Sequence, residues 1–309
     1  IIIPGLGDSL KNVKGTAFPF SLMYRLFAKD FKVYVFSRKN RIEKNYSTRD
    51  MAADLATVIK QLGIGKASIM GISQGGMIAQ YLAIDFPEIV EKLILAVTLC
   101  RQNETSKRVI SNWISLANKN DFKGIFVDMA EKIYTQKRAR VQRPFNPILS
   151  AFMRPKSLHN FIIQATACIN HDSSALLHKI QCPVLIVGGD DDKVVGGNSS
   201  NEIAQFIKGS QVKIYSGYGH STYEEAKEKL TQFTKTPKTF LCKGEEHSFY
   251  ISLGYAEYPR SGSNHSQLMR CADAALYEIK LHGKNGCMAY REGLQSGVRK
   301  QLGFALKDV

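Results

Sequence analysis

The chain of 309 residues has few cysteines, a deficit of acidic residues and no long apolar run. Its six cysteines lie far apart and form no C-x-x-C pair, which argues against a zinc site and a small disulfide scaffold. Reduced thiols of this kind are typical of cytoplasmic proteins, and no run approaches the length of a membrane span. The chain begins Ile-Ile-Ile-Pro without a visible signal peptide. We therefore expect a cytoplasmic protein, with targeting left open if the true start is missing.

The deficit of acidic residues gives the chain a strong positive charge. Against 42 Lys and Arg residues it has 27 Asp and Glu residues, for a net charge of +15. An excess of this size is compatible with a nucleic acid or an anionic surface as partner. The basic residues are scattered, however, and the densest group, at 132–143, contains only Tyr134 as an aromatic. We interpret this group as a solvated helix surface, with an anion-binding face as the alternative.

The most informative stretch is KASIMGISQGGMIAQ at 66–80. Its apolar run predicts a buried strand at 67–70, followed by a sharp turn at 71–75 and a helix at 76–86. Between a strand and a helix, G-x-S-x-G indicates a tight turn with an exposed serine. The turn strains the backbone of Ser73 and requires nearly side-chain-free neighbours at Gly71 and Gly75. Such a turn lifts the Ser73 hydroxyl above the sheet edge, where N–H groups at the helix start can stabilise an oxyanion.

The rest of the first 235 residues alternates strand-like and helix-like segments. Strands are predicted at 1–3, 32–36, 92–98, 184–187 and 211–215, and helices at 18–27, 49–62, 200–208 and 222–233. Ser47 or Thr48 is the expected N-cap of the second helix. This alternation predicts an α/β fold with a parallel, doubly wound sheet. Between 99 and 180 the apolar residues recur at helical spacing and no strand is predicted.

Across residues 1–235 these features resemble the α/β-hydrolase family. The resemblance implies an α/β-hydrolase fold in which residues 100–180 form a helical cap over the active site. It assigns the turn after the first strand to the oxyanion loop, with Pro4 where the family commonly has His. The two oxyanion-binding N–H groups would then belong to Leu6 and to Gln74, the residue after Ser73. The large apolar residues of the cap are interpreted as helix-packing core, with lining of the substrate pocket as the alternative: Trp113, Phe126, Met129, Phe152, Met153 and Phe161.

The resemblance also implies an acid and a base that follow Ser73 in the chain. In GDDDKVV at 189–195 the family pattern selects Asp192 as the acid, with Asp191 and Asp190 as the alternatives. The triplet lacks the alternating spacing and distal glutamate of a calcium loop, so we expect no metal there. His220, in SGYGHSTYEE at 216–225, completes the Ser, Asp, His order of the fold. The other histidines are interpreted as surface or satisfied core residues: His159, His171, His178, His247, His265 and His282.

Residues 236–247 are polar and are predicted to be a junction, and the segment after them does not resemble a hydrolase. A strand is predicted at 249–256 and a helix at 266–280. Within 248–291, the string ADAALYEIK followed by GKN resembles the end of a GGDEF-type diguanylate cyclase domain. The Gly-Gly-Asp-Glu-Phe signature and the metal-binding carboxylates of that family are absent, so we expect residues 248–309 to be non-catalytic. A fusion of two reading frames, for instance in environmental DNA, would explain this combination.

Together these patterns predict a serine carboxylesterase that hydrolyses small to medium acyl esters. Ser73 would attack the ester carbonyl, His220 would transfer the proton, and Asp192 would orient His220. The alternatives are a lactonase, a carbon–carbon bond hydrolase or a cofactor-free haloperoxidase of the same fold. A non-catalytic signalling fusion that uses the GGDEF-like tail is the alternative from another class. We expect a small-molecule ester substrate, no cofactor, no metal, no nucleic-acid partner and no membrane span, and leave homo-oligomer formation open.

Overall fold

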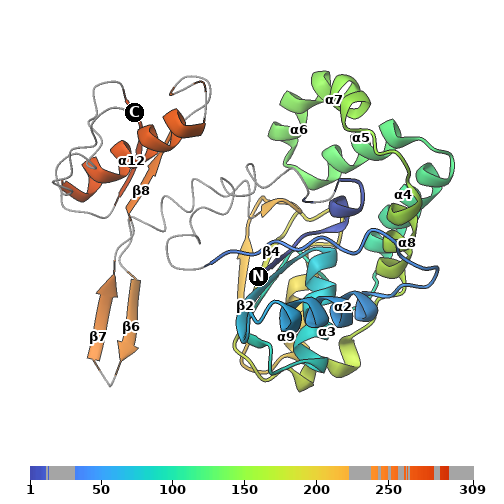
Figure 1. The fold of residues 1–309 in the computed structure, drawn as a ribbon, viewed down its shortest axis with the longest axis horizontal. Helices are drawn as coiled ribbons and strands as arrows, with labels where there is room; N and C mark the ends of the chain where they lie inside the picture. The colour runs from blue at the N-terminus through green and yellow to red at the C-terminus, as the bar shows by residue number, and fades with distance from the viewer. Residues whose placement is uncertain are drawn as a thin grey trace. The chain divides into compact units, whose positions relative to one another are not determined.

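A computed structural model of the chain describes residues 1–11, 13, 32–222, 238–242, 245–249, 252–256, 261, 263, 265–281 and 286–291. The chain divides into two compact units, residues 1–225 and residues 226–309 (Figure 1). The helix predicted at 18–27 lies outside the described residues, as does the helix at 222–233 beyond Thr222.

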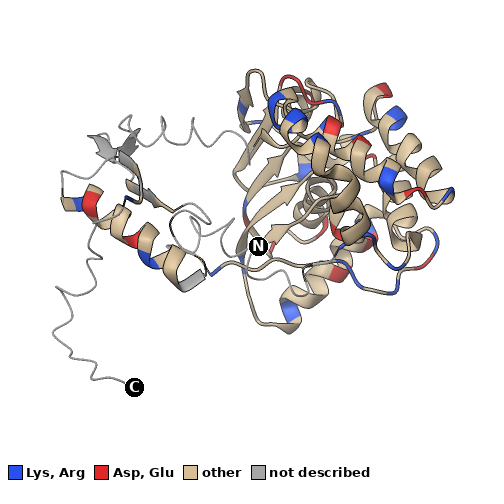
Figure 2. Cartoon of the chain, turned by 90° about the horizontal axis from the view of Figure 1, so that it is seen from above, with Lys and Arg blue, Asp and Glu red and all other residues tan. Residues whose placement is uncertain are grey.

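The first unit carries its charges in a mixed pattern. Lys and Arg residues and Asp and Glu residues are spread over several of its elements (Figure 2), whereas residues 132–171 contain no Asp or Glu. This distribution agrees with the scattered basic residues in the sequence. No helix in the described ranges combines the length and the apolar character that crossing a bilayer requires.

A sheet of five parallel strands forms the centre of the first unit. The strands follow one another across the sheet in the order β1-β2-β3-β4-β5. Their bounds are β1 Ile2–Ile3, β2 Ala67–Ile72, β3 Val90–Ala96, β4 Val184–Gly189 and β5 Gln211–Tyr215. The strand predicted at 32–36 is present only as a parallel bridge between Val35 and Ile2. Because β1 is two residues long, it offers no longer ladder for this segment to join.

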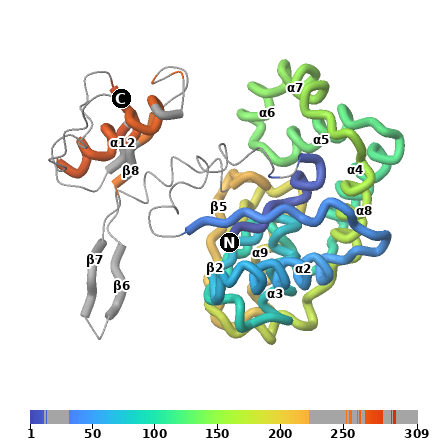
Figure 3. The backbone as a smooth tube through the Cα atoms, in the orientation of Figure 1, coloured from blue at the N-terminus to red at the C-terminus, as the bar shows by residue number. Residues whose placement is uncertain are grey.

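Three helices of the doubly wound unit share an apolar cluster with one face of the sheet (Figure 3). They are α2 Thr48–Gln61, α3 Gln74–Asp85 and α9 Ser199–Phe206. A capping box starts α2: Ser47 accepts from the Asp50 N–H, and the Asp50 carboxylate accepts from the Ser47 N–H. Strand residues such as Ile69, Leu93 and Ile186 point into this cluster and are fully buried. The parallel sheet that the sequence predicts is therefore packed against these helices through a shared apolar core.

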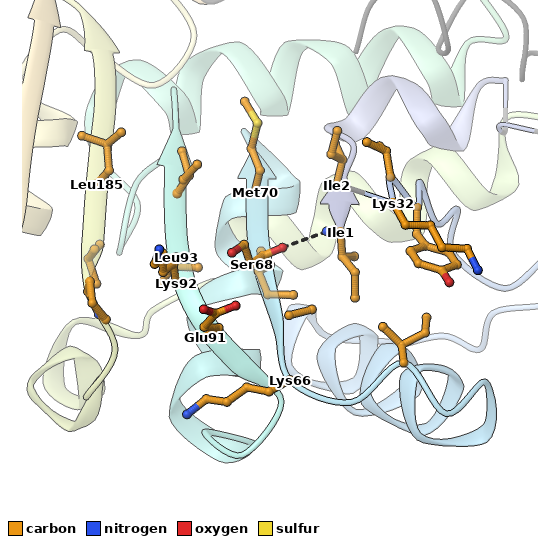
Figure 4. A pocket seen from close by; sticks show the side chains of 18 of the residues that line it. Ile1, Ile2, Lys32, Lys66, Ser68, Met70, Glu91, Lys92, Leu93 and Leu185 are labelled. Carbon is orange, nitrogen blue, oxygen red and sulfur yellow. Dashed lines mark hydrogen bonds between the residues drawn. The ribbon is translucent and has the colours of Figure 1, made fainter. Parts of the chain in front are cut away.

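On the opposite face of the sheet, residues of its strands and of the segments that precede them line a cavity of about 740 Å³ (Figure 4). Ser68 and Met70 of β2 and Leu185 of β4 line it on the two sides of β3, and the Ile1 nitrogen donates to the Ser68 carbonyl at 2.8 Å. The lining residues come from the early part of the strands, whereas Ser73 follows the last residue of β2. None of the three predicted catalytic residues lines this cavity.

Between β3 and β4 the chain forms the helical insertion that the sequence predicts. Its helices are α4 Glu104–Asn118, α5 Phe122–Ile133, α6 Gln136–Gln142, α7 Asn146–Met153 and α8 His159–Ile169, with 3₁₀ turns η3 Arg143–Phe145 and η4 Ser174–Lys179. Trp113 and Phe161 are buried in one apolar cluster, against which Phe126 and Met129 pack. The core interpretation therefore holds for these four residues. The remaining two predicted core residues, Phe152 and Met153, are exposed on α7.

The second unit contains two pairs of strands and one long helix. Strands β6 Lys238–Cys242 and β7 Glu245–Phe249 pair antiparallel, whereas β8 Ser252–Tyr255 and β9 Gly286–Ala289 pair parallel. Helix α12, His265–Leu281, covers the helix predicted at 266–280. The strand predicted at 249–256 is divided between β7 and β8. The β6–β7 hairpin occupies most of residues 236–247, the segment that the sequence predicts as a junction.

Candidate active site

The tight turn between β2 and α3 places Ser73 in a strained backbone conformation. Its φ of 54° and ψ of −118° lie where residues with a side chain are rarely found. The Ser73 N–H donates to the Ala96 carbonyl at 2.9 Å, and the Ser73 carbonyl accepts from the Thr98 hydroxyl at 2.7 Å. These bonds to β3 and the segment after it hold the turn in place. The hydroxyl of Ser73 is thereby fixed at the carboxyl end of the sheet.

The glycines beside Ser73 are required by the close approach of neighbouring backbone. A Cβ on Gly75 would lie 1.9 Å from the Ile3 carbonyl oxygen, and one on Gly71 would lie 2.4 Å from the Gly75 carbonyl oxygen. Both distances are far below van der Waals contact, and the contacting atoms are backbone atoms, which cannot rotate away as a flexible side chain could. The G-x-S-x-G spacing is therefore a packing requirement of β1, β2 and α3.

Asp192, His220 and Ser73 form a continuous chain of hydrogen bonds. The His220 Nε2 lies 2.9 Å from the Ser73 Oγ, and the His220 Nδ1 lies 2.8 Å from the Asp192 Oδ2. Only 5% of Asp192 and 7% of His220 is exposed to solvent. The carboxylate beside Nδ1 favours a proton on that nitrogen, which leaves the Nε2 lone pair directed at the Ser73 hydroxyl.

The three neighbouring aspartates have different partners, and only Asp192 contacts His220. The second oxygen of Asp192 accepts from the N–H groups of Val194 and Val195, at 2.8 and 3.0 Å, which fixes the carboxylate. The Gly217 N–H donates to Asp190 and holds the pKa of that carboxyl below its usual value. Asp191 forms an exposed ion pair with Lys193. Of the three positions left open by the sequence, Asp192 is the one that the fold brings to the histidine.

The loop after β1 brings the two predicted oxyanion residues beside Ser73. A Cβ on Gly5 would lie 3.3 Å from the Ser73 Cβ, so the loop passes directly over the serine. Leu6 is the first residue of the 3₁₀ turn η1, Leu6–Ser9, and Gln74 is the first residue of α3. The N–H of a first helical residue has no acceptor within its own helix. Both positions can therefore offer an N–H to a negatively charged oxygen on Ser73.

Beneath this loop lies a buried ion pair that the sequence reading did not identify. The Arg38 and Asp8 side chains, 4% and 3% exposed, meet at 3.4 Å, and the Ser37 hydroxyl donates to Asp8 at 2.6 Å. The Arg38 guanidinium also donates to the Pro4 carbonyl and, at 3.0 Å, to the Gln74 side chain. Burial lowers the pKa of Arg38, an effect that the charge of Asp8 opposes. Arg38 thus connects the loop after β1 to Gln74.

Gln74 continues this network into the cap. Its side-chain N–H groups donate to the Gln164 carbonyl at 2.9 Å and to the Cys168 Sγ at 3.2 Å, both on α8. Burial raises the pKa of the Cys168 thiol to about 12, so this cysteine stays protonated and unreactive at neutral pH. The turn at Ser73 and the cap are therefore joined by polar contacts as well as by the apolar cluster.

The remaining histidines lie outside the hydrogen-bond chain. His159 and His178 are exposed, whereas His171 is buried with its Nδ1 2.9 Å from the Thr48 hydroxyl. Burial lowers the pKa of His171 to about 3. The side chains of His247, His265 and His282 lie outside the described residues. Within the described ranges, no three His, Cys, Asp or Glu side chains gather as a metal site would require.

Comparison with known families agrees with this architecture. The sequence model of the alpha/beta hydrolase fold family matches residues 1–227. Since this match covers most of the chain, the protein belongs to the α/β-hydrolase family, and it is a hydrolase of that superfamily. A second model, the GGDEF domain of diguanylate cyclases, matches residues 214–286. Both resemblances seen in the sequence are confirmed, although the GGDEF match begins earlier than the predicted residue 248.

Individual relatives are distant and differ in the reactions their names state. RutD of Pseudomonas savastanoi pv. phaseolicola, provisionally named a carbamate hydrolase, is 24% identical over 189 residues, covering 58% of this chain and 70% of RutD. An esterase of Exiguobacterium antarcticum is 22% identical with a TM-score of 0.57, and the match covers 75% of this chain and 88% of the esterase. The enol-lactonase of Burkholderia xenovorans LB400 is 17% identical with a TM-score of 0.61, and the match covers 69% of this chain and 84% of the lactonase. At these identities the structural likeness establishes a shared fold.

Proposed function

We propose that residues 1–225 act as a serine carboxylesterase on small to medium acyl esters, with Ser73 as the nucleophile. The observation that carries this proposal is the hydrogen-bond chain from Asp192 through His220 to the Ser73 hydroxyl. It ends at a hydroxyl beside two helix-start N–H groups, those of Leu6 and Gln74. A nucleophile, a base, an orienting acid and an oxyanion site together constitute the machinery of acyl transfer.

The first half of the reaction acylates Ser73. The Ser73 oxygen attacks the ester carbonyl carbon while its proton passes to the His220 Nε2. The carbonyl oxygen becomes an oxyanion that accepts from the Leu6 and Gln74 N–H groups, each of which contributes about 3 kcal/mol to the transition state. The intermediate then collapses, the His220 proton is given to the leaving alcohol, and the acyl-enzyme remains. Asp192 stabilises the imidazolium throughout.

The second half of the reaction releases the acid. His220 accepts a proton from a water molecule, whose oxygen attacks the acyl carbonyl on Ser73. The second oxyanion occupies the same pair of N–H groups, and the proton returns from His220 to the Ser73 oxygen. The protein ends in the state in which it began, and Ser73, His220 and water account for every bond and proton in these steps.

The same machinery would open a cyclic ester, which is the reaction named for one of the proteins of this fold. In a lactone, the leaving oxygen stays attached to the acyl group, so the steps at Ser73 and His220 are unchanged. The enol-lactonase named above has this fold, and RutD adds carbamates as a further class of acyl compound. We assign no catalysis to the second unit, because the sequence lacks the Gly-Gly-Asp-Glu-Phe signature.

A substrate panel separates these alternatives. We would measure hydrolysis of p-nitrophenyl esters from acetate to palmitate, an enol-lactone and a carbamate by the full chain and by Ser73→Ala. The proposal expects the esters to be hydrolysed with the highest kcat/KM, and all hydrolysis to be lost in the variant. A higher kcat/KM for the lactone would identify the protein as a lactonase in place of a carboxylesterase, with Ser73 still the nucleophile. Ester hydrolysis that persists in Ser73→Ala would refute both.

A further inference from the structure

The outer helices of the cap expose an unusual set of large apolar side chains. Of the ten exposed large hydrophobic residues in the described chain, five lie between positions 141 and 153. They are Val141, Phe145, Ile148, Phe152 and Met153. Phe152 is 89% exposed and Ile148 is 72% exposed. Single exposed apolar residues are ordinary, but a cluster of this kind marks an interaction surface.

Four of these side chains fall on one side of a helical segment, residues 136–153, here called the α6–α7 face. Val141, Phe145, Ile148 and Phe152 follow one another at spacings of four, three and four residues, which are the spacings of neighbours on a helix. The backbone stays in the right-handed helical region through Arg143 and Phe145, which join α6 to α7. Both helices lie in the cap next to α5, at the end of the first unit marked α7 (Figure 1).

The surroundings of the α6–α7 face are strongly basic. Residues 132–171 contain seven Lys and Arg residues and no Asp or Glu. Lys137, Arg140 and Lys156 are exposed and form no ion pair within the described residues, whereas Arg143 is paired with Glu131. The face therefore offers unneutralised positive charge beside exposed apolar side chains.

We propose that the α6–α7 face binds an anionic lipid surface. Helices that lie in a membrane interface combine Phe, Leu or Ile side chains, which enter the acyl region, with Lys and Arg, which meet the headgroups. A second copy of this chain is a poorer occupant, because two such faces would bring like charges together. A nucleic acid would neutralise the basic residues and leave the aliphatic side chains in water. The lipid surface satisfies both features at once.

Binding to lipid through the cap would bring the hydrolase unit to water-insoluble esters. The cap shares an apolar cluster with the loop residue Leu6 and with Val194 beside the proposed acid. The proposal does not depend on the esterase assignment, since vesicle binding is measured without any substrate. It also agrees with the absence of a membrane-spanning helix among the described residues, because an interfacial helix lies on the bilayer.

The experiment is sedimentation of the full chain with two kinds of vesicle. One is pure phosphatidylcholine, and the other is phosphatidylcholine mixed with phosphatidylglycerol. We expect binding to the anionic vesicles that weakens as salt is raised. Replacing both apolar side chains, Ile148→Ser with Phe152→Ser, is expected to weaken binding about a hundredfold, or about tenfold per side chain. The matched control is Leu62→Ser, which removes an apolar side chain that is 57% exposed on another surface and should leave binding unchanged.

A second pair of variants tests the basic residues. Lys137→Gln with Arg140→Gln is expected to weaken binding about 25-fold, since each basic residue near an anionic surface contributes about fivefold. Lys107→Gln with Lys208→Gln, two exposed lysines elsewhere in the first unit, is the charge-matched control. Each variant is first shown to have the urea unfolding midpoint of the parent, which excludes misfolding as the cause of lost binding.

Three results would overturn the proposal. The first is the absence of binding to anionic vesicles, or binding that none of the face variants weakens. The second is a dimer in sedimentation velocity that Phe152→Ser dissociates while vesicle binding is absent, which would assign the face to a second copy. The third is salt-sensitive retention on DNA that Lys137→Gln with Arg140→Gln abolishes, again without vesicle binding, which would assign it to nucleic acid.

Discussion

The buried pair of Arg38 and Asp8 gives the sharpest test of how the oxyanion loop is held. Three variants form a double-mutant cycle: Arg38→Met, Asp8→Asn and the two combined. Arg38→Met keeps the length of the side chain and removes its bonds to Asp8, to the Pro4 carbonyl and to Gln74. Asp8 would then remain as a charge in a site that is almost closed to solvent, with the Ser37 hydroxyl and the residue 38 N–H as its donors.

The expected loss of stability follows from the burial of the Arg38–Asp8 ion pair. Removing one partner of a buried ion pair costs about 3–5 kcal/mol, because the other charge is left without compensation. Removing both charges avoids that cost, so we expect the double variant to be more stable than the sum of the single effects predicts. The coupling free energy between the two sites should be at least about 2 kcal/mol. An exposed pair would give about 0.5 kcal/mol or less.

The assay is urea unfolding followed by tryptophan fluorescence. The chain has a single tryptophan, Trp113, which lies in α4 of the first unit and is buried. The signal therefore reports the unfolding of the hydrolase unit, whatever the second unit does. A coupling free energy below about 0.5 kcal/mol would refute the reasoning, since it would mean that the two charges do not stabilise each other. We also expect Arg38→Met to lower kcat more than it raises KM, because a displaced oxyanion loop affects the transition state.

Three further predictions follow from the elements around Ser73. Gly75→Ala places a Cβ against the Ile3 carbonyl and should destabilise the unit by more than about 3 kcal/mol. The control is Gly7→Ala, whose added Cβ has no atom within 4 Å and which should unfold like the parent. Equal urea unfolding midpoints for the Gly75→Ala and Gly7→Ala variants would contradict this prediction. Asp192→Asn should lower kcat about 10⁴-fold, as in other triads, with little change in fold; a loss below tenfold, measured on an ester, would exclude Asp192 as the orienting acid. Because the pKa of His171 is lowered to about 3, the unfolded chain binds a proton below about pH 6.5 that the folded chain does not. The free energy of unfolding should therefore fall by about 2 kcal/mol between pH 7 and pH 5 on account of this residue, and His171→Gln should remove that part of the pH dependence in urea titrations.

The elements that the sequence predicts well are those with a strong local pattern. The strand, turn and helix around Ser73 combine an apolar run, two glycines and helical periodicity, so a short window contains the whole signal. Helix α12 is found for the same reason. The segment at 32–36 has a strand composition as well, but its ladder depends on β1, which is too short to extend it.

The features that the sequence does not predict depend on contacts between distant residues. Asp8 and Arg38 are thirty residues apart, and the sequence around each of them gives no indication that they form an ion pair. The choice of Asp192 over Asp190 rests on which carboxylate the loop turns toward His220. Strands β6, Lys-Thr-Phe-Leu-Cys, and β7, Glu-Glu-His-Ser-Phe, lack the alternation of apolar and polar residues that predicts a strand, so their pairing is not evident from the local sequence.

The central claim is that Ser73 is an activated nucleophile. Its most direct test is to treat the full chain with a fluorophosphonate, which reacts with activated serines, and to map the adduct by peptide mass spectrometry. The account predicts one adduct, on the peptide that contains Ser73, with labelling lost in Ser73→Ala and strongly slowed in His220→Ala. Labelling should be unchanged in Ser68→Ala, which alters a serine of β2 that faces the cavity on the opposite side of the sheet. A folded chain that takes no label, or that is labelled at another serine, would contradict the account.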